Sequence, residues 1–221
     1  MPEAVNLEPL WLTLKVASIA TLIAFLVGSP WRCSSRARFV GRDWLDAVLT
    51  LPMVLPPTVL GYYLIVLLGR RSPLGQWLEG TFEFTFIFTW QGAVIASAIV
   101  ALPLVFKSAR AAFEGVEPNL EKAARVLGSK ESKVFLHVTL PLAMRGILAG
   151  TMLAFARAMG EFGATLMIAG NIPGRTQTLS MAVYDAVQAG NDALANFLVI
   201  LISVTCIVIL VSSGKLLAPK Y

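Results

Sequence analysis

One pair of ionisable residues stands out from an otherwise apolar part of the sequence. Arg157 and Glu161 lie four positions apart in the segment RAMGEFG. Residues at this spacing share one face of a helix and can pair, although Arg before Glu is the less favourable order. Charges in an apolar segment usually pair with each other or mark a pathway, and the adjacent Gly160 and Gly163 allow close helix approach or bending. A structural ion pair and a direct role in a gate or in oxyanion contact both remain open.

Other kinds of chemistry find little support in the sequence. The two cysteines, Cys33 and Cys206, are far apart, and His137 is the single histidine. These residues form no metal-binding spacing and no catalytic set. A Gly-Lys pair at Gly214 and Lys215 lacks both the following Ser or Thr and the first Gly of a phosphate-binding loop. We therefore expect no metal site, no resident cofactor, no catalytic residue and no ATP hydrolysis by this chain alone.

The composition indicates an integral membrane protein. Of 221 residues, 57% are hydrophobic and 14% are charged, whereas a soluble domain has about 25% charged residues. A helix needs about 20 mostly apolar residues to cross the hydrocarbon core. We expect a single all-α membrane domain over residues 1–221, with about five transmembrane helices at residues 10–28, 45–68, 84–106, 147–169 and 194–217.

The basic residues indicate orientation rather than nucleic-acid binding. Cytoplasmic segments of membrane proteins carry an excess of Lys and Arg. Here the segments after the first and third spans and the C-terminal tail are the basic ones, and they hold Arg32, Arg36, Arg38, Arg42, Arg110, Lys122, Arg125, Lys130, Lys133, Lys215 and Lys220. We therefore predict a cytoplasmic C-terminus and an external N-terminus. The first span has no Lys or Arg before Lys15, so it does not resemble a signal peptide.

Three prolines interrupt the second span. Pro52, Pro56 and Pro57 lie in the segment LPMVLPPTVLG. Each removes a helical hydrogen bond, so the helix must bend or break. Irregular backbone at membrane depth is tolerated where protein or water covers it. A structural kink and a break that lines a pathway are both compatible with this pattern.

The charged segment EKAARVLGSKESKVFLHVTLP, residues 121–141, is unusual between two apolar spans. A helix is expected from Pro118, with an apolar stripe formed by Leu120, Ala123, Ala124 and Leu127. Gly128 permits the left-handed conformation that ends helices. A second short helix is expected from near Ser129 to Pro141. We call residues 118–141 the elbow.

The elbow is too short to form its own core. Its apolar stripe must therefore lie on the membrane, on the rest of the chain or on a partner. Ala123 and Ala124 at the centre of the stripe favour close approach to a protein surface, whereas a helix resting on lipid headgroups prefers Trp, Phe or Leu there.

The loop GNIPGRTQTLSMAVYDAVQAGND offers a third candidate site. Its turn residues precede a short apolar-striped run that is compatible with a helix at the outer interface. Arg175 and Thr176 could donate hydrogen bonds to an oxyanion or to a binding protein, and a plain solvated turn is equally compatible with the pattern.

The segment AARVLGSKESKVFLHVTLP resembles the EAA loop of ABC-importer permeases. In that family the loop is a coupling helix that inserts into a cytoplasmic ATPase. The resemblance assigns ATPase coupling to residues within about 108–143, namely Leu120, Glu121, Ala123, Ala124, Leu127, Gly128, Phe135, Leu140 and Pro141. The family's acidic position is occupied here by Lys122, with Glu121 displaced by one residue.

Further segments are similar to the molybdate permeases of the ModB type. They are LPMVLPPTVLGYYL, FTWQGAVIASAIVALPL, FARAMGEFGAT and AGNIPGRTQTLSMAVYDAVQAG. The resemblance weakens over residues 28–42. Sulfate permeases share Gly-Glu-Phe-Gly but are less similar to GNIPGRTQT. As candidates for a pathway or gate we take Pro56, Pro57, Arg157, Gly160, Glu161, Gly163, Thr165, Arg175 and Thr176.

The resemblance implies an ABC-importer permease fold and a transport subunit rather than an enzyme. It implies a homodimer in a prokaryotic inner membrane, two cytoplasmic ATPases that bind ATP and Mg²⁺, and an external molybdate-binding protein. Transport would follow alternating access at the homodimer interface. Tungstate or sulfate transport is the nearest alternative. An ion-gradient transporter or a membrane-embedded enzyme would leave the elbow unexplained, and only Glu161 is a candidate coupling-ion carboxylate.

Overall fold

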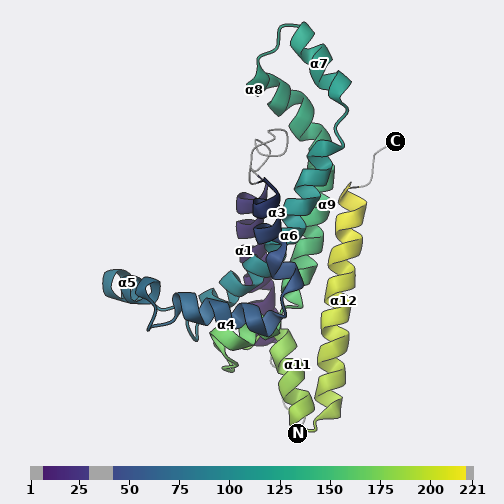
Figure 1. Cartoon of the computed structure of the whole chain (residues 1–221). Coiled ribbons are helices and arrows are strands. Elements are labelled where there is room, and N and C mark those ends of the chain that lie inside the picture. The colour runs from purple at the N-terminus through teal and green to yellow at the C-terminus, as the bar shows by residue number, and fades with distance from the viewer. Residues whose placement is uncertain (1–6, 30–41, 218–221) are drawn as a thin grey trace.

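The computed structural model describes residues 7–29 and 42–217, and within these ranges the regular structure is helical. The predicted basic residues Arg32, Arg36, Arg38 and Lys220, together with Cys33, lie outside the described residues. The elements, labelled as in Figure 1, are α1 (Glu8–Gly28), α3 (Arg42–Val54), α4 (Pro57–Leu68), α5 (Pro73–Phe82), α6 (Trp90–Glu114), α7 (Pro118–Val126), α8 (Glu131–Val134), the π-helix η1 (Phe135–Thr139), α9 (Leu140–Met159), α10 (Gly163–Ala169), α11 (Leu179–Gln188) and α12 (Asp192–Leu217).

The expected spans are largely confirmed. Within the described residues four helices are long and apolar enough to cross a membrane, and the bent pair α3 and α4 brings the number to as many as five. The third span was placed too early, because α6 begins at Trp90. Glu83 and Phe88 have φ angles of 51° and 56°, which end the preceding helix and prevent an early start. The hydroxyl of Thr89 then caps α6 by accepting from the Gly92 N–H.

The fourth span also differs from its prediction. Residues 147–169 do not form one helix, because α9 ends at Met159 and α10 begins at Gly163. In the other direction, the helical path extends from Glu131 through η1 to Met159, over 29 residues. The span and part of the elbow therefore belong to one continuous helical rod.

Helices α1, α6 and α9 form the centre of the bundle, where each contacts the other two (Figure 1). Small residues permit their close approach. A Cβ added to Gly150 would lie 2.0 Å from the Ser108 Cβ, and one added to Gly146 would lie 2.7 Å from the Ala112 Cβ. Glycines four residues apart thus allow α9 to pack directly against α6, as is common in membrane helix pairs.

The predicted break in the second span is confirmed. Helices α3 and α4 are bent by 114° relative to each other, at the position of Pro56. Helix α4 then packs against α10, and α5 projects away from the bundle beyond α4 (Figure 1).

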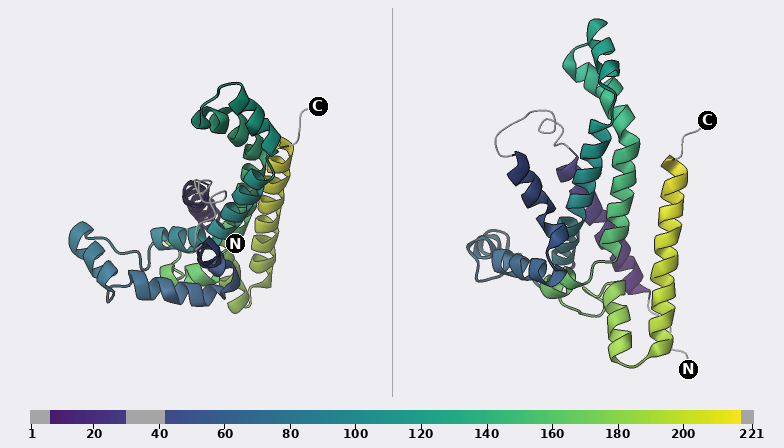
Figure 2. Two further views of the ribbon diagram at one scale, coloured as in Figure 1. Left: turned by 45° about the horizontal axis from the view of Figure 1, so that its top comes forward. Right: turned by 45° about the vertical axis from the view of Figure 1, so that its right-hand side comes forward.

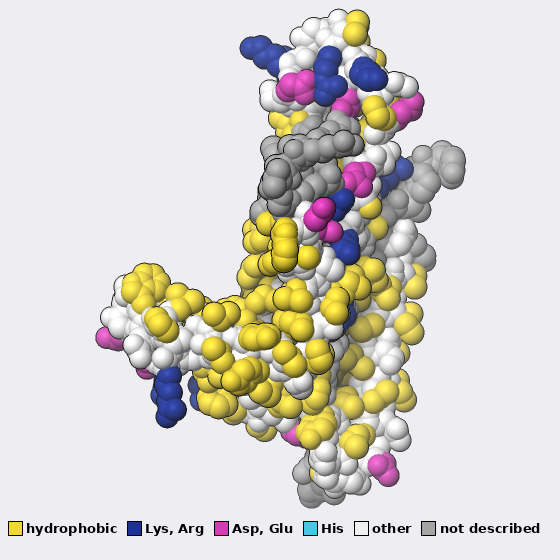
Figure 3. Space-filling model, in the orientation of Figure 1, with side chains coloured by type: hydrophobic (Ala, Val, Ile, Leu, Met, Phe, Trp, Pro, Cys, Tyr) yellow, Lys and Arg dark blue, Asp and Glu magenta, His cyan; other side chains and the backbone are white. Residues whose placement is uncertain are grey.

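The two ends of the molecule differ in character. Helices α7 and α8 form a projection at one end, which we call the elbow end, while α11 and the start of α1 lie at the opposite end (Figures 1 and 2). The last turn of α12 lies toward the elbow end (Figure 2). Hydrophobic side chains cover the face of α3 and α4 seen in Figure 3, and charged side chains gather on the elbow. This division suits a protein whose middle is in lipid and whose elbow is in water.

Candidate functional site

The first helix of the elbow and the turn after it have the predicted local structure. Helix α7 has Pro118 in its first turn and is followed by Gly128 with φ of 82°. The N–H of Ser129 bonds to the Ala124 carbonyl at 3.1 Å, and the Gly128 N–H bonds to the Arg125 carbonyl at 2.9 Å. These two hydrogen bonds form the Schellman arrangement at a helix C-terminus. Gly128 is needed here for its left-handed backbone conformation.

The predicted end of the second helix is wrong. The chain does not leave the helical path at Pro141, but continues from α8 through η1 into α9. In η1 the Leu140 N–H bonds to the Phe135 carbonyl, five residues back. This wider turn directly precedes Pro141, which has no N–H to donate and lies in the first turn of α9. The proline is thereby accommodated without a stop.

The apolar stripe of α7 faces largely outward. The exposed fraction is 45% for Leu120 and 85% for Leu127. Ala123 is exposed and Ala124 is half-buried. Val126, at 88%, is the most exposed of the large hydrophobic residues that the structure describes, although it lies off the predicted stripe. An apolar residue outside the periodic pattern was the signal that could have identified it.

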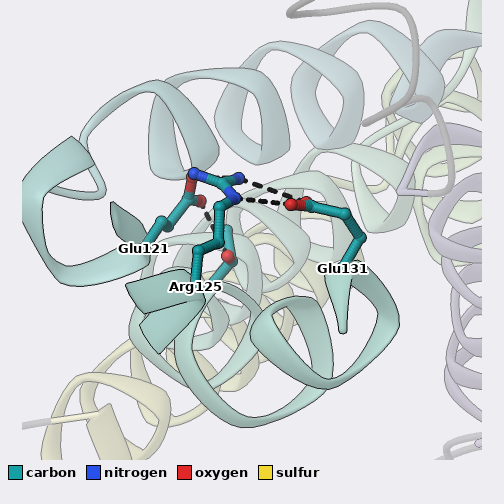
Figure 4. Close-up of polar contacts among 4 residues, drawn as sticks. Glu121, Arg125 and Glu131 are labelled. Carbon is teal, nitrogen blue, oxygen red and sulfur yellow. Dashed lines mark hydrogen bonds and ion pairs between the residues drawn. The ribbon is translucent and has the colours of Figure 1, made fainter. Parts of the chain in front are cut away.

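Glu121 points inward and connects α7 to η1. Its side chain is 1% exposed. Its Oε1 accepts a hydrogen bond from the Thr139 hydroxyl at 2.7 Å. Its Oε2 lies 3.5 Å from the Arg125 guanidinium, which also binds both carboxylate oxygens of Glu131 (Figure 4). The hydrogen bond with Glu131 is the main cause that raises the pKa of Arg125. Thr139 was not among the predicted site residues.

The remaining predicted coupling residues connect the elbow to the bundle. The Phe135 ring lies 6.2 Å from the Phe113 ring. Both Phe135 and Leu140 pack against the buried cluster that contains Phe113 and Ile147. Pro141 is exposed. The elbow therefore has an outward part on α7 and an anchoring part on η1 and α9.

Arg157 and Glu161 form the predicted pair, but not on one helix. Glu161 lies in the break after α9, and it is 2% exposed. Arg157 donates to Glu161 Oε2 at 2.8 Å, while the Ala164 N–H donates to Glu161 Oε1 at 3.0 Å. One carboxylate thus connects the last turn of α9 to the first turn of α10. Gly160 provides the C-cap of α9.

The broken spans meet next to this pair. A Cβ on Gly163 would lie 2.9 Å from the Pro57 Cβ, and a Cβ on Gly61 would lie 2.5 Å from the Met167 Cβ. Pro56 is the N-cap of α4 and Pro57 is its first residue. The structure therefore brings Pro57, Gly163, Glu161 and Arg157 into one region.

Thr165 belongs to the same short helix, α10, and it is 1% exposed. Its hydroxyl is one of the buried side-chain oxygens that have no hydrogen-bond partner among the residues that the structure describes. Sequence alone could not reveal this, because the burial of Thr165 depends on how α10 packs.

Arg175 and Thr176 lie in a separate region. The Thr176 hydroxyl donates to the Gly170 carbonyl and accepts from the Ile172 N–H, both at 3.1 Å, so it shapes the loop. Arg175 is exposed. A cavity of about 370 Å³ lies between this loop and the start of α6, and it is lined by Phe84, Phe88, Thr89, Trp90, Gln91, Gly174, Arg175 and Thr176. Residues 84–91 of this lining were not among the predicted site residues.

Over residues 7–29 and 42–217, no group of three or more His, Cys, Asp or Glu is arranged to hold a metal ion. Lys15 lies with its Nζ 3.8 Å from the centre of the Trp90 ring.

Comparison with known proteins shows the family of this chain. A family model described as "Binding-protein-dependent transport system inner membrane component" matches residues 20–221. The molybdenum transport system permease protein ModB of Escherichia coli K12 is 45% identical over 213 residues, which are 93% of each chain. ModB of Haemophilus influenzae is 41% identical over 186 residues, covering 84% of this chain and 80% of that protein.

A solved structure supports the fold. A chain of the MetNI methionine ABC transporter, in an inward-facing conformation, matches with a TM-score of 0.75 over 98% of both chains, at 16% identity. At this identity the similarity concerns the fold alone.

Proposed function

Because this chain belongs to the family of inner-membrane components of binding-protein-dependent transport systems, we propose that it is the permease subunit of an ATP-driven molybdate importer. The similarity to molybdenum permeases over nearly the whole chain supports molybdate as the substrate. Tungstate and sulfate are the alternative oxyanions. The chain is a transport subunit, and ATP with Mg²⁺ is bound by the partner ATPase.

The observation that carries this proposal is the elbow on its continuous helix. An outward apolar surface on α7 has no other element of the described chain against it, as the exposure of Val126 and Leu127 indicates. The helical rod begins at Glu131, directly after the turn that follows α7, and ends at Met159, next to Arg157 and Glu161. A movement imposed on the elbow can therefore reach the broken spans through one element. We assign the elbow to ATPase coupling and the breaks to the gate.

The complete transporter would contain two copies of this chain and two ATPases. Large apolar faces support such an assembly. In the apolar stretch of α12, only 11% of the residues are buried within one chain. Lipid and a second copy would cover these faces, and the pathway would run between the copies. An external molybdate-binding protein would deliver the anion to the end opposite the elbow, where Arg175 is exposed.

Uptake by the reconstituted complex tests the proposal. Proteoliposomes should contain the permease with its co-purifying ATPase inside and the molybdate-binding protein outside. We expect molybdate uptake that requires ATP and the binding protein, and that excess sulfate does not suppress. Uptake driven by an ion gradient without ATP would contradict the proposal, and preferential sulfate uptake would reassign the substrate.

A further inference from the structure

The outward face of α7 is cationic around an apolar centre. Lys122, Ala123, Val126 and Leu127 are all exposed. Lys122 and Val126 are four residues apart and therefore share a helix face. The cation thus lies on the same face as Val126, which is 88% exposed.

The carboxylates next to Lys122 and Lys130 in sequence are both paired with Arg125. Glu121, next to Lys122 in sequence, is buried against Thr139 and Arg125. Glu131 is bound by Arg125 (Figure 4). In contrast, Lys122, Lys130 and Lys133 form no ion pair within residues 7–29 and 42–217. Arg125 therefore engages both carboxylates, of which Glu121 is buried and Glu131 is 70% exposed, and the lysines are left to an external partner.

Building on the proposed function, we propose that the ATPase receives α7 in a cleft with an apolar floor and a carboxylate rim, and that Lys122 engages this rim. Complementary charge at the edge of an apolar contact gives register and speeds association. Val126 and Leu127 would occupy the floor. A basic rim would repel Lys122. Glu121, its neighbour in sequence, is turned inward against Thr139 and does not offset this repulsion.

A protein cleft fits this face better than an anionic lipid surface. The elbow projects beyond the hydrophobic face of α3 and α4 (Figure 3). The small, exposed Ala123 at the centre of the stripe favours close approach to a protein surface, whereas a helix in the headgroup region prefers Trp, Phe or Leu at such a position. The two partners differ in a measurable way, because only the protein cleft can hold Lys122 when anionic lipid is absent.

The test measures the dissociation constant of the purified, co-purifying ATPase for the permease in nanodiscs of zwitterionic lipid. We expect Lys122→Glu to weaken binding by about tenfold or more at low salt and Lys122→Ala by about threefold, with both effects smaller at 0.5 M salt. Arg71→Glu is the matched control, since it makes the same charge change on an exposed residue in the segment between α4 and α5, away from the elbow. This control should bind as the wild type does.

Unchanged or tighter binding by Lys122→Glu at every salt concentration would overturn the acidic rim. A loss that appears only in nanodiscs with anionic lipid would make lipid the partner and also overturn it. Size-exclusion chromatography should show that each variant is folded and of wild-type size, and Lys122→Ala provides the comparison if the reversal disturbs assembly. If the wild type itself binds no ATPase, the proposed function fails as well.

Discussion

At the scale of single residues, Glu121 illustrates what a motif can and cannot predict. The sequence placed Glu121 in the segment that resembles the coupling loop, but it did not reveal the direction of the Glu121 side chain. That direction depends on where Thr139 lies after the chain turns back at Gly128. The buried carboxylate is better suited to fixing the angle between α7 and the helical rod than to contacting a partner.

This role for Glu121 makes a specific prediction. Thr139→Val removes the hydroxyl that donates to Glu121, and losing a buried hydrogen bond to a charged group costs roughly 1.5–3 kcal/mol. We expect Thr139→Val and Glu121→Ala each to reduce molybdate uptake per ATP hydrolysed, while ATPase binding changes little. The double mutant should be no worse than Glu121→Ala, because that substitution already removes the hydrogen bond that Thr139→Val breaks.

Ser132→Ala, at an exposed position on α8, serves as the control and should retain wild-type coupling. If Glu121 instead contacts the ATPase directly, Glu121→Ala will weaken ATPase binding and Thr139→Val will not. That pattern would contradict an internal role.

The second residue-scale prediction concerns Glu161. Glutamine at this position retains an acceptor for the Ala164 N–H but loses the charge that pairs with Arg157. We therefore expect Glu161→Gln to impair uptake more than assembly, measured by transport assay and size-exclusion chromatography. Arg145→Gln on the exposed side of α9 is the control and should transport normally. Recovery of both folding and full transport in the Arg157→Gln, Glu161→Gln double mutant would show that the pair is only structural.

At the scale of elements, the sequence predicts what local chemistry determines. Pro118 and Gly128 mark the two ends of the first elbow helix, and Pro56 marks the bend of the second span. The continuous path through Pro141 was missed because a π turn depends on hydrogen bonds five residues apart, for which the sequence has no clear signal. The break after Met159 was missed because it depends on the close packing of Gly163 against Pro57 of another span, while the hydrogen bond between Glu161 and Ala164 is local.

Gly128 allows an element-scale prediction. No atom lies within 4 Å of a Cβ built at this residue, so a side chain there meets no steric obstacle. The φ of 82° is nevertheless unfavourable for a β-branched residue, at about 1–2 kcal/mol. We expect Gly128→Val to leave membrane insertion and dimerisation intact while it weakens ATPase co-purification or uncouples hydrolysis from uptake, because the orientation of α7 changes.

Gly80→Val is the matched control, since a Cβ at Gly80 also meets nothing within 4 Å and no left-handed φ is involved. Gly80 lies on α5, away from the elbow. Normal ATPase association and normal uptake in Gly128→Val would argue against the elbow as the coupling element.

At the scale of the whole molecule, the composition of the chain predicted a membrane bundle, and the resemblance of its segments to known permeases predicted the family. The arrangement of the candidate residues depends on how the helices pack, which the sequence did not reveal. The pair Arg157 and Glu161 lies beside the α4–α10 contact, whereas Arg175 lies by a separate cavity. Residues of that cavity between 84 and 91 are apolar or uncharged, so their types alone gave no reason to select them.

The orientation of the chain in the membrane is the last prediction. Helix α1 begins at the end opposite the elbow, and α12 ends toward the elbow (Figure 2). If the positive-inside rule holds, the elbow faces the cytoplasm and the turn after α11 faces outward. Single cysteines can test this in a background with Cys33→Ser and Cys206→Ser. Lys130→Cys and Gln188→Cys are suitable sites, because both residues are exposed.

An impermeant thiol reagent added to intact cells should modify the cysteine at position 188 and not the one at position 130. Permeabilised cells provide the control, because both cysteines should then react, which shows that neither is hidden by the fold. The reverse pattern in intact cells would place the elbow outside. Since a cytoplasmic ATPase could not then reach α7, that single result would exclude both the orientation and the coupling role that depends on it.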